Sequence, residues 1–167
     1  AVLPEEGHDE AEVLRLAASL ERGSEHPLAE AIVEGAKARG LSLGNGEEFE
    51  AVTDKGVIGK VDGRDVAIGN NALMTSLGID CDTGEETADR LRGEGKTAMF
   101  VALDGRLAGL VAVADPIKPT AEAAIRDLHD LGIKVIMATG DNERTALAVA
   151  TVAGVTGSRH ATARPLG

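Results

Sequence analysis

Two Asp-Gly dipeptides, Asp62-Gly63 and Asp104-Gly105, constrain the fold of this chain more than any other feature of its sequence. Each lies between short apolar runs, and an Asp-Gly pair in that setting is typical of a two-residue β-hairpin turn. We therefore predict strands within residues 48–69 and a second hairpin built from residues 97–103 and 107–114. The middle of the chain is expected to be sheet.

Helical periodicity flanks these strands. Apolar residues at helical spacing predict a helix over residues 9–21, ended by Gly23, and a second helix that stops at Gly40. Short helices are expected over residues 70–77 and 83–92, between the two hairpins. A helical hairpin therefore opens the chain, and further helices interrupt the sheet.

The last third of the chain has a different pattern. It predicts a helix over 119–131, a buried strand over 135–138 and a further helix that follows directly and ends near residue 153. Helix, strand and helix in this order are typical of part of a parallel α/β layer. Residues 156–167 have no periodicity and are expected to be poorly ordered.

Composition narrows the possible partners and the compartment. The chain carries 17 basic and 28 acidic residues, a formal net charge of −11, which opposes binding to nucleic acid or to an anionic membrane. No apolar run is long enough to span a bilayer, and the first residues resemble no signal peptide. The single cysteine, Cys81, suits a reducing compartment, so we expect the cytoplasm. Phe49 and Phe100 are the only aromatic residues, so a nucleobase pocket would use aliphatic side chains, histidine and backbone.

Three sequence features lack the pattern that a phosphate or metal site needs. Residues 93–97, Gly-Glu-Gly-Lys-Thr, end like a phosphate-binding P-loop, but Arg90 stands at the first glycine position and an apolar strand follows. The acidic residues of 80–86 lack calcium-loop spacing, and the four histidines have no metal-ligand spacing. No metal site is predicted.

Residues 24–28, Ser-Glu-His-Pro-Leu, are more informative. Proline in the first helical turn places His26 at a helix N-terminus, where free amides and the helix dipole disfavour a charged imidazolium. A neutral ring there could lie against a nucleobase, with Glu21 five residues earlier. The alternative is a histidine that only caps its own helix.

Three further groups could hold phosphate. Gly56 and Gly69 lie inside strand-like sequence, where something must approach the backbone closely, and Lys55 and Lys60 add local positive charge. The alternative is ordinary hairpin glycines. Thr-Gly-Asp-Asn at 139–142 joins a strand to a helix, where an oxyanion or magnesium could bind, although a plain helix cap explains it equally well.

The ordered set of these motifs resembles the heavy-metal-transporting P-type ATPases, most closely the copper-transporting type. The resemblance covers residues 1 to about 153, and its motifs are Ser-Glu-His-Pro-Leu, the glycine-bearing strands, Gly-Asn, Asp-Pro-Ile-Lys-Pro and Thr-Gly-Asp-Asn. It implies an α+β fold: a twisted antiparallel sheet flanked by helical hairpins, followed by a partial α/β segment like haloacid dehalogenases. Residues 1–4 would be a hinge remnant, 5–112 the nucleotide-binding domain, 113–155 part of the phosphorylation domain and 156–167 a tail.

The resemblance also implies roles for individual residues. Glu21 and His26 would contact the adenine end of ATP. The other nucleotide-binding positions would be Lys55, Gly56, Val57, Gly69 and Asn70. Asp54 stands where the family has the first glycine of Gly-x-Gly, and an acidic side chain there could crowd or repel the nucleotide.

In the last third of the chain, Asp115 and Lys118 would belong to the hinge, and Thr139 and Asp141 to the Thr-Gly-Asp motif near the phosphorylated aspartate. The sequence contains neither Asp-Lys-Thr-Gly-Thr, which carries that aspartate, nor Gly-Asp-Gly-x-Asn-Asp, which helps bind magnesium. The chain should therefore bind ATP, with Mg²⁺, but not turn it over, because the reaction passes through an aspartyl phosphate.

The expected whole is a cytoplasmic domain of an integral membrane pump, monomeric in isolation, with ATP or ADP and the pump's phosphorylation, actuator and transmembrane domains as partners. Three alternatives stay open: a free-standing haloacid-dehalogenase-like phosphatase, a zinc or cadmium pump domain, and an interaction module that has lost nucleotide binding.

Overall fold

The computed structural model describes residues 1–114, 119–133, 137–139 and 158–160. The chain divides into two units, the first comprising Ala1–Asp89 and Ala98–Val113, the second Arg90–Thr97 and Ala114–Gly167. Among the described residues, no helix combines the length and the apolar character that crossing a membrane requires.

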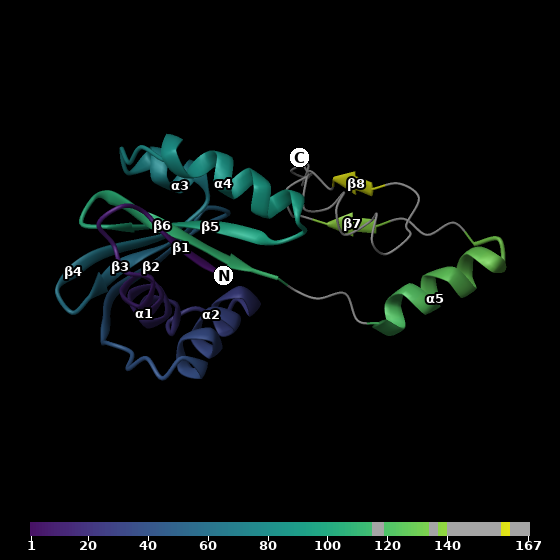
Figure 1. Ribbon diagram of the computed structural model, residues 1–167, viewed down its shortest axis with the longest axis horizontal. Coiled ribbons are helices and arrows are strands. Elements are labelled where there is room, and N and C mark those ends of the chain that lie inside the picture. The colour runs from purple at the N-terminus through teal and green to yellow at the C-terminus, as the bar shows by residue number, and fades with distance from the viewer. Residues whose placement is uncertain (115–118, 134–136, 140–157, 161–167) are drawn as a thin grey trace, which may run out of the picture. The chain divides into compact units, whose positions relative to one another are not determined.

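A six-stranded sheet forms the centre of the first unit (Figure 1). Its spatial order is β1-β6-β5-β4-β3-β2. The strands are β1 (Val2–Pro4), β2 (Gly46–Val52), β3 (Gly56–Val61), β4 (Arg64–Gly69), β5 (Thr97–Leu103) and β6 (Arg106–Val113). The registered pairs β1–β6, β2–β3, β3–β4 and β4–β5 are all antiparallel.

Both predicted hairpins are confirmed, and the backbone explains them. Asp62 and Asp104 have φ of 53° and 49°, and the glycines that follow them have φ of 79° and 78°. Positive φ at both central residues defines a type I′ turn, whose twist matches that of the strands it joins. Strand β1 was not predicted, because three residues are too few to show a periodicity.

Four helices cover the two faces of this sheet (Figure 1). On one face lie α1 (Glu10–Glu21) and α2 (Pro27–Ala38), and on the other α3 (Asn71–Ser76) and α4 (Asp82–Gly93). The side chain of Asp9 caps α1 by accepting from the N–H groups of Ala11 and Glu12. Gly40 follows α2 with φ of 69°, a left-handed conformation that glycine adopts at little cost. The predicted α+β architecture is confirmed.

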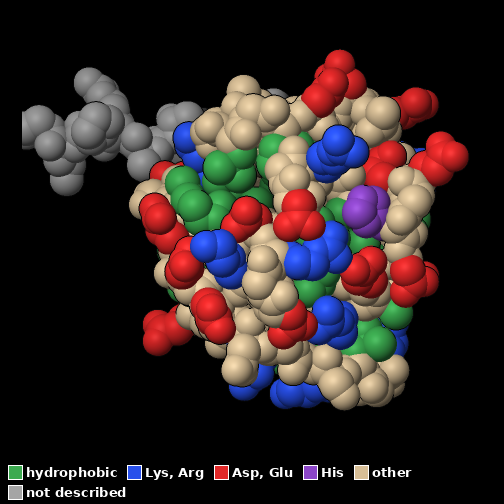
Figure 2. Space-filling model, turned by 90° about the vertical axis from the view of Figure 1, so that its left-hand side faces the viewer, with side chains coloured by type: hydrophobic (Ala, Val, Ile, Leu, Met, Phe, Trp, Pro, Cys, Tyr) green, Lys and Arg blue, Asp and Glu red, His purple; other side chains and the backbone are tan. Residues whose placement is uncertain are grey.

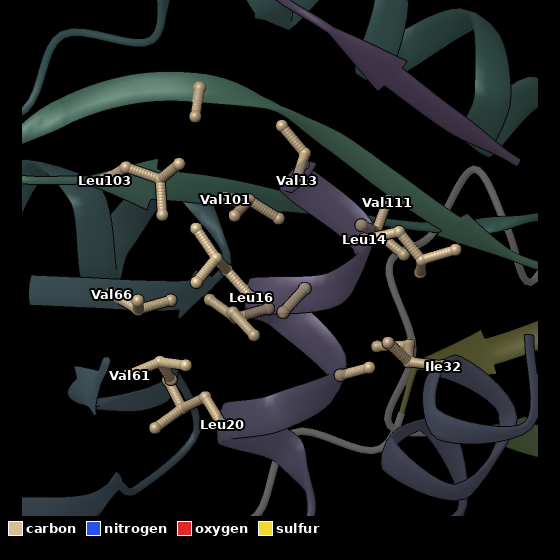
Figure 3. Close-up of a cluster of buried hydrophobic side chains, with 14 of the residues drawn as sticks. Val13, Leu14, Leu16, Leu20, Ile32, Val61, Val66, Val101, Leu103 and Val111 are labelled. Carbon is tan, nitrogen blue, oxygen red and sulfur yellow. The ribbon is translucent and has the colours of Figure 1, made fainter. Parts of the chain in front are cut away.

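The main core lies between α1, α2 and the sheet (Figure 3). Its labelled members are Val13, Leu14, Leu16 and Leu20 of α1, Ile32 of α2, and Val61, Val66, Val101, Leu103 and Val111 of the strands. All are at most 3% exposed. Burying each such side chain contributes roughly 1.5 to 3 kcal/mol. Because Leu20 is held in this core, the last turn of α1 and the loop after it are anchored on the sheet.

In the second unit the structure describes α5 (Pro119–Asp130), β7 (Met137–Thr139) and β8 (Ser158–His160). The predicted helix over 119–131 is confirmed, and β7 overlaps the predicted strand. Strands β7 and β8 pair in parallel. Strand β8 lies within residues 156–167, which were expected to be poorly ordered, and it was not predicted because a short strand needs only backbone partners and no side-chain periodicity. The helix predicted to end near residue 153 lies outside the described residues.

Candidate functional site

His26 is the N-cap of α2 and its imidazole is exposed. Its Nδ1 accepts a hydrogen bond from the backbone N–H of Leu28 at 3.2 Å, and its own backbone N–H donates to Ser24 Oγ at 3.2 Å. An accepting Nδ1 carries no proton, so in the neutral ring Nε2 carries it. The structure therefore confirms that His26 caps its own helix, and the cap leaves an N–H donor on the exposed edge of the ring.

Glu21 ends α1 and is only 6% exposed. Burial raises the pKa of its carboxyl, while a hydrogen bond with Ser24 and the nearby His26 oppose that shift. Ser24 therefore joins Glu21 to the backbone of His26. The sequence interpretation gave Ser24 no part in the binding site, although Ser24 belongs to the Ser-Glu-His-Pro-Leu motif.

Gly56 and Gly69 are paired across β3 and β4. Gly56 has φ of 147°, and a Cβ added to it would collide with the carbonyl oxygen of Ile68 and lie 2.6 Å from the Cα of Gly69. A Cβ added to Gly69 would collide with the carbonyl oxygen of Lys55 and lie 2.7 Å from Cδ2 of Leu73. The backbone of the opposite strand therefore occupies the space that each glycine leaves. This agrees with the alternative that these are ordinary hairpin glycines.

Asn70 ties the β2–β3 turn to α3. Its Nδ2 donates to the carbonyl oxygen of Asp54 at 2.8 Å, and its backbone N–H donates to that of Lys55 at 2.9 Å. Its Oδ1 accepts from the backbone N–H of Leu73 at 3.0 Å, which caps α3. The Gly-Asn sequence is thus a structural joint that sets the position of the turn.

Asp54 lies in that turn with φ of 58°. This is the left-handed region, which glycine enters freely and aspartate tolerates. Glycine, which the family resemblance expects at this position, would adopt this backbone conformation freely.

Two lysines were predicted to supply positive charge, and the structure separates them. Lys60 is ion-paired with Glu48 at 2.8 Å. It lies on the α3 face, since the neighbouring Gly59 faces Leu20 of α1 and successive residues of a strand alternate. No ion pair of Lys55 is found among the described residues. Val57, another predicted nucleotide-binding position, is buried in the core with 7% exposure. On the face drawn in Figure 2, acidic side chains are interspersed with basic ones, so positive charge there is local.

The α3 face of the first unit carries a groove of about 430 Å³. Its lining residues include Glu50, Ile58, Lys60, Ala67, Leu77 and Ile79. The lining of this groove does not include the predicted site residues Glu21, His26, Gly56 and Gly69. The structure therefore gives two clusters of predicted site residues, the α1–α2 turn and the joint of the β2–β3 turn with α3. Both clusters lie in the first unit, and each hydrogen bond described above joins residues of the same cluster.

Other predictions have simpler outcomes. The Gly-Glu-Gly-Lys-Thr segment joins the end of α4 to the start of β5, so rejection of a P-loop is confirmed. Thr139 is the last residue of β7. Asp115, Lys118 and Asp141 lie outside the described residues. Among the residues that are described, no three His, Cys, Asp or Glu side chains gather as metal ligands.

The comparisons with known proteins agree with one another. A family described as haloacid dehalogenase-like hydrolase matches residues 3–166. A copper-transporting P-type ATPase of Rhizobium leguminosarum is 63% identical over 143 residues, 86% of this chain and 17% of that protein. A copper-exporting P-type ATPase of Legionella pneumophila is 54% identical over 142 residues, 85% of this chain and 19% of that protein.

Two solved structures extend the comparison. A zinc-transporting PIB-type ATPase in an E2.Pi state has a TM-score of 0.73 at 32% identity, covering 96% of this chain and 26% of that one. The N-domain of HMA8, a copper-transporting P-type ATPase, has a TM-score of 0.56 at 26% identity, covering 68% of this chain and 97% of that one. The chain belongs to the haloacid dehalogenase-like hydrolase family and, within it, to the heavy-metal P-type ATPases. It spans less than a fifth of the length of the two curated relatives above.

Proposed function

We propose that the first unit is the ATP-binding domain of a copper-transporting P-type ATPase, and that it presents the nucleotide to an aspartate outside this chain. The observation that carries the proposal is the geometry of His26. Its ring is exposed, its orientation is set by the Leu28 amide, and its Nε2–H is available to a ligand. The likeness to an isolated N-domain supports the same assignment.

His26 would hold the purine through its ring face and the Nε2–H donor. Glu21, under the turn, keeps Ser24 and hence the backbone of His26 in place. The main chain around Gly56, Val57, Gly69 and Asn70 would form the remaining wall. Lys55 is the cation placed to offset phosphate charge, since Glu48 already neutralises Lys60.

Magnesium would reach this site with the nucleotide. Bound Mg²⁺ neutralises phosphate oxygens during phosphoryl transfer. The residue of this chain expected nearest to it, Asp141, lies outside the described residues, so its fit to a metal is a prediction from the Thr-Gly-Asp resemblance. The chain's own part is to bind and orient ATP without hydrolysing it, because the nucleophile motif is absent from the sequence.

Copper is the transported ion that the comparisons favour. The two curated relatives with 63% and 54% identity are copper transporters, whereas the zinc-transporting structure is 32% identical. The same module would serve either ion, since ATP binding and ion coordination occur in different parts of such a pump.

An NMR titration of the whole chain with ADP and ATP, with and without magnesium, tests the proposal. We expect amide shifts within residues 21–28 and 53–70. His26→Gln should weaken binding by roughly 1 to 2 kcal/mol, the scale of one lost hydrogen bond. Lys55→Met should weaken it too, whereas the matched Lys60→Met should not. Shifts confined to other residues would refute the site, and hydrolysis of a phosphate monoester would favour the phosphatase alternative.

A further inference from the structure

Phe49 touches the turn that carries the proposed nucleotide site. A Cβ added to Gly23 would lie 3.0 Å from Cδ2 and 3.1 Å from Cγ of the Phe49 ring. Gly23 was interpreted as a helix stop, yet its φ is outside the left-handed region that such stops use. The ring of Phe49, and not the backbone, explains why glycine fits here.

A β-bulge aims Phe49 at this turn. In the β2–β3 ladder Glu47 pairs with Lys60 and Glu50 with Ile58, so Glu48 and Phe49 together oppose Gly59. Glu48 has φ of 54°. Such a bulge changes which side of the sheet the following side chains face.

The change of side can be followed along β2. A Cβ on Gly46 would lie 3.2 Å from the carbonyl oxygen of Ser19, so Gly46 faces α1. Residues three apart in a regular strand face opposite sides, yet Phe49 also faces α1. Gly59 leaves room for this arrangement, because a Cβ there would lie 2.7 Å from Cδ1 of Leu20 and 2.9 Å from the carbonyl oxygen of Glu47.

The contact has a direct route to His26. Gly23 N–H donates to the carbonyl oxygen of Leu20 at 3.2 Å, and Ser24 N–H to that of Glu21 at 2.9 Å. Ser24 Oγ then accepts from the backbone N–H of His26. The chain has two aromatic residues, of which Phe100 is fully buried, whereas Phe49 is 37% exposed. The exposed ring of Phe49 thus lies against Gly23, the residue next to Ser24, whose hydroxyl accepts the hydrogen bond from His26.

We infer that Phe49 is a positioning residue for the nucleotide site: its ring, aimed by the β2 bulge, buttresses Gly23 and so holds the turn on which the Leu28 amide orients the His26 imidazole. The expected effect on nucleotide affinity rests on the proposed function. The expected effect on His26 itself does not. If the turn without the ring adopts the binding geometry in about a fifth of the molecules, the dissociation constant for ADP rises about fivefold.

The test is a double-mutant cycle on the whole chain, comprising Phe49→Ala, Gly23→Ala and the double variant. The readouts are the ring ¹⁵N and ¹³C resonances of His26 without nucleotide, and the dissociation constant for ADP. Each single variant should shift the His26 resonances and raise the dissociation constant. Gly23→Ala should have no further effect when the ring is absent, because the three atoms nearest to the added methyl all belong to that ring.

Two additional variants keep the outcome clear. Phe49→Leu, which preserves apolar bulk, replaces Phe49→Ala if the latter fails to fold. Leu77→Ala removes a side chain that is 43% exposed on the other face of the sheet, and should leave both readouts unchanged. Unchanged His26 resonances in both Phe49 variants, or an equal effect of Gly23→Ala with and without the ring, would overturn the inference. Absence of ADP binding by the wild type would refute the proposed function, while the His26 resonances would still decide the inference.

Discussion

Gly56 and Gly69 are paired across β3 and β4, and each one leaves the space that the opposite strand occupies. Side chains at these positions would meet the carbonyl oxygens of Ile68 and Lys55, which are backbone atoms held by the ladder. Neither can move aside cheaply. These two glycines are therefore requirements of the fold first, whatever the ligand requires of them.

We expect Gly69→Ala to lower the free energy of unfolding by roughly 2 to 4 kcal/mol, because overpacking and backbone shifts add. The matched control is Gly35→Ala in α2, where an added Cβ meets nothing within 4 Å. Replacing a glycine inside a helix in this way should stabilise by about 0.5 to 1 kcal/mol. Urea denaturation measures both, and equal effects of the two substitutions would contradict the assignment.

Replacing Asp54 should strengthen nucleotide binding. At roughly 6 Å in water, one pair of unit charges interacts by about 0.7 kcal/mol, so removing the carboxylate is worth about threefold in affinity per phosphate charge. Asp54→Asn removes the charge and tolerates the φ of 58°, whereas Asp54→Gly also relieves the backbone. Calorimetry with ADP separates the two effects. Unchanged affinity in both variants would show that Asp54 does not face the phosphates.

Glu21→Gln should stabilise the protein in a pH-dependent way. Burial raises the pKa of the Glu21 carboxyl above 4.5, so the folded chain holds this proton more tightly than the unfolded chain. The wild type therefore loses stability as pH rises from about 4.5 through the folded pKa. Gln has no such loss, so the advantage of the variant should be present at about pH 8 and vanish near pH 4.

Urea denaturation at those two pH values measures the difference. Glu25→Gln, which removes an exposed carboxylate from the same turn, controls for the change in net charge. An advantage of Glu21→Gln that is equal at both pH values would contradict burial as the cause.

Cys81 should be unreactive in the folded protein. Burial, aided by the charges of Glu85, Asp80 and Asp82, raises the pKa of its thiol to about 11. At pH 8 about one thiol in a thousand is then ionised, and the thiolate is the reactive form. Alkylation by iodoacetamide, followed by mass spectrometry, should become rapid only in denaturant. Fast labelling of the native chain would contradict the buried environment.

Local chemistry made much of the fold predictable. Asp62-Gly63 and Asp104-Gly105 specify type I′ turns through their positive φ, and the apolar stripe of α1 specifies which face is buried. Strand β1 escaped prediction because its stability comes from pairing with β6, whose residues lie more than a hundred positions away.

The candidate site was predictable only in part. His26 was recognisable as an N-cap from the proline after it, yet the tautomer that the Leu28 amide selects is a property of three-dimensional geometry. Ser24 and Phe49 gave no periodic pattern, since each matters through a contact with a residue on another element or turn. The sequence did not distinguish Lys60 from Lys55 as a possible phosphate-binding cation. The structure does, because strand alternation places Lys60 on the α3 face and Glu48 forms an ion pair with it.

The hairpins, the family and the helices of the described residues could be predicted from the sequence alone, because turn preference and apolar spacing act over a few residues and ordered motifs are read directly. Three-dimensional contacts were needed to show that the paired glycines serve strand contact, that Glu21 is buried, and that the β2 bulge turns Phe49 toward Gly23. Strand pairing brings the two glycines together, the packing of α1 on the sheet buries Glu21, and the bulge brings Phe49 to Gly23, and none of these follows from residue spacing alone.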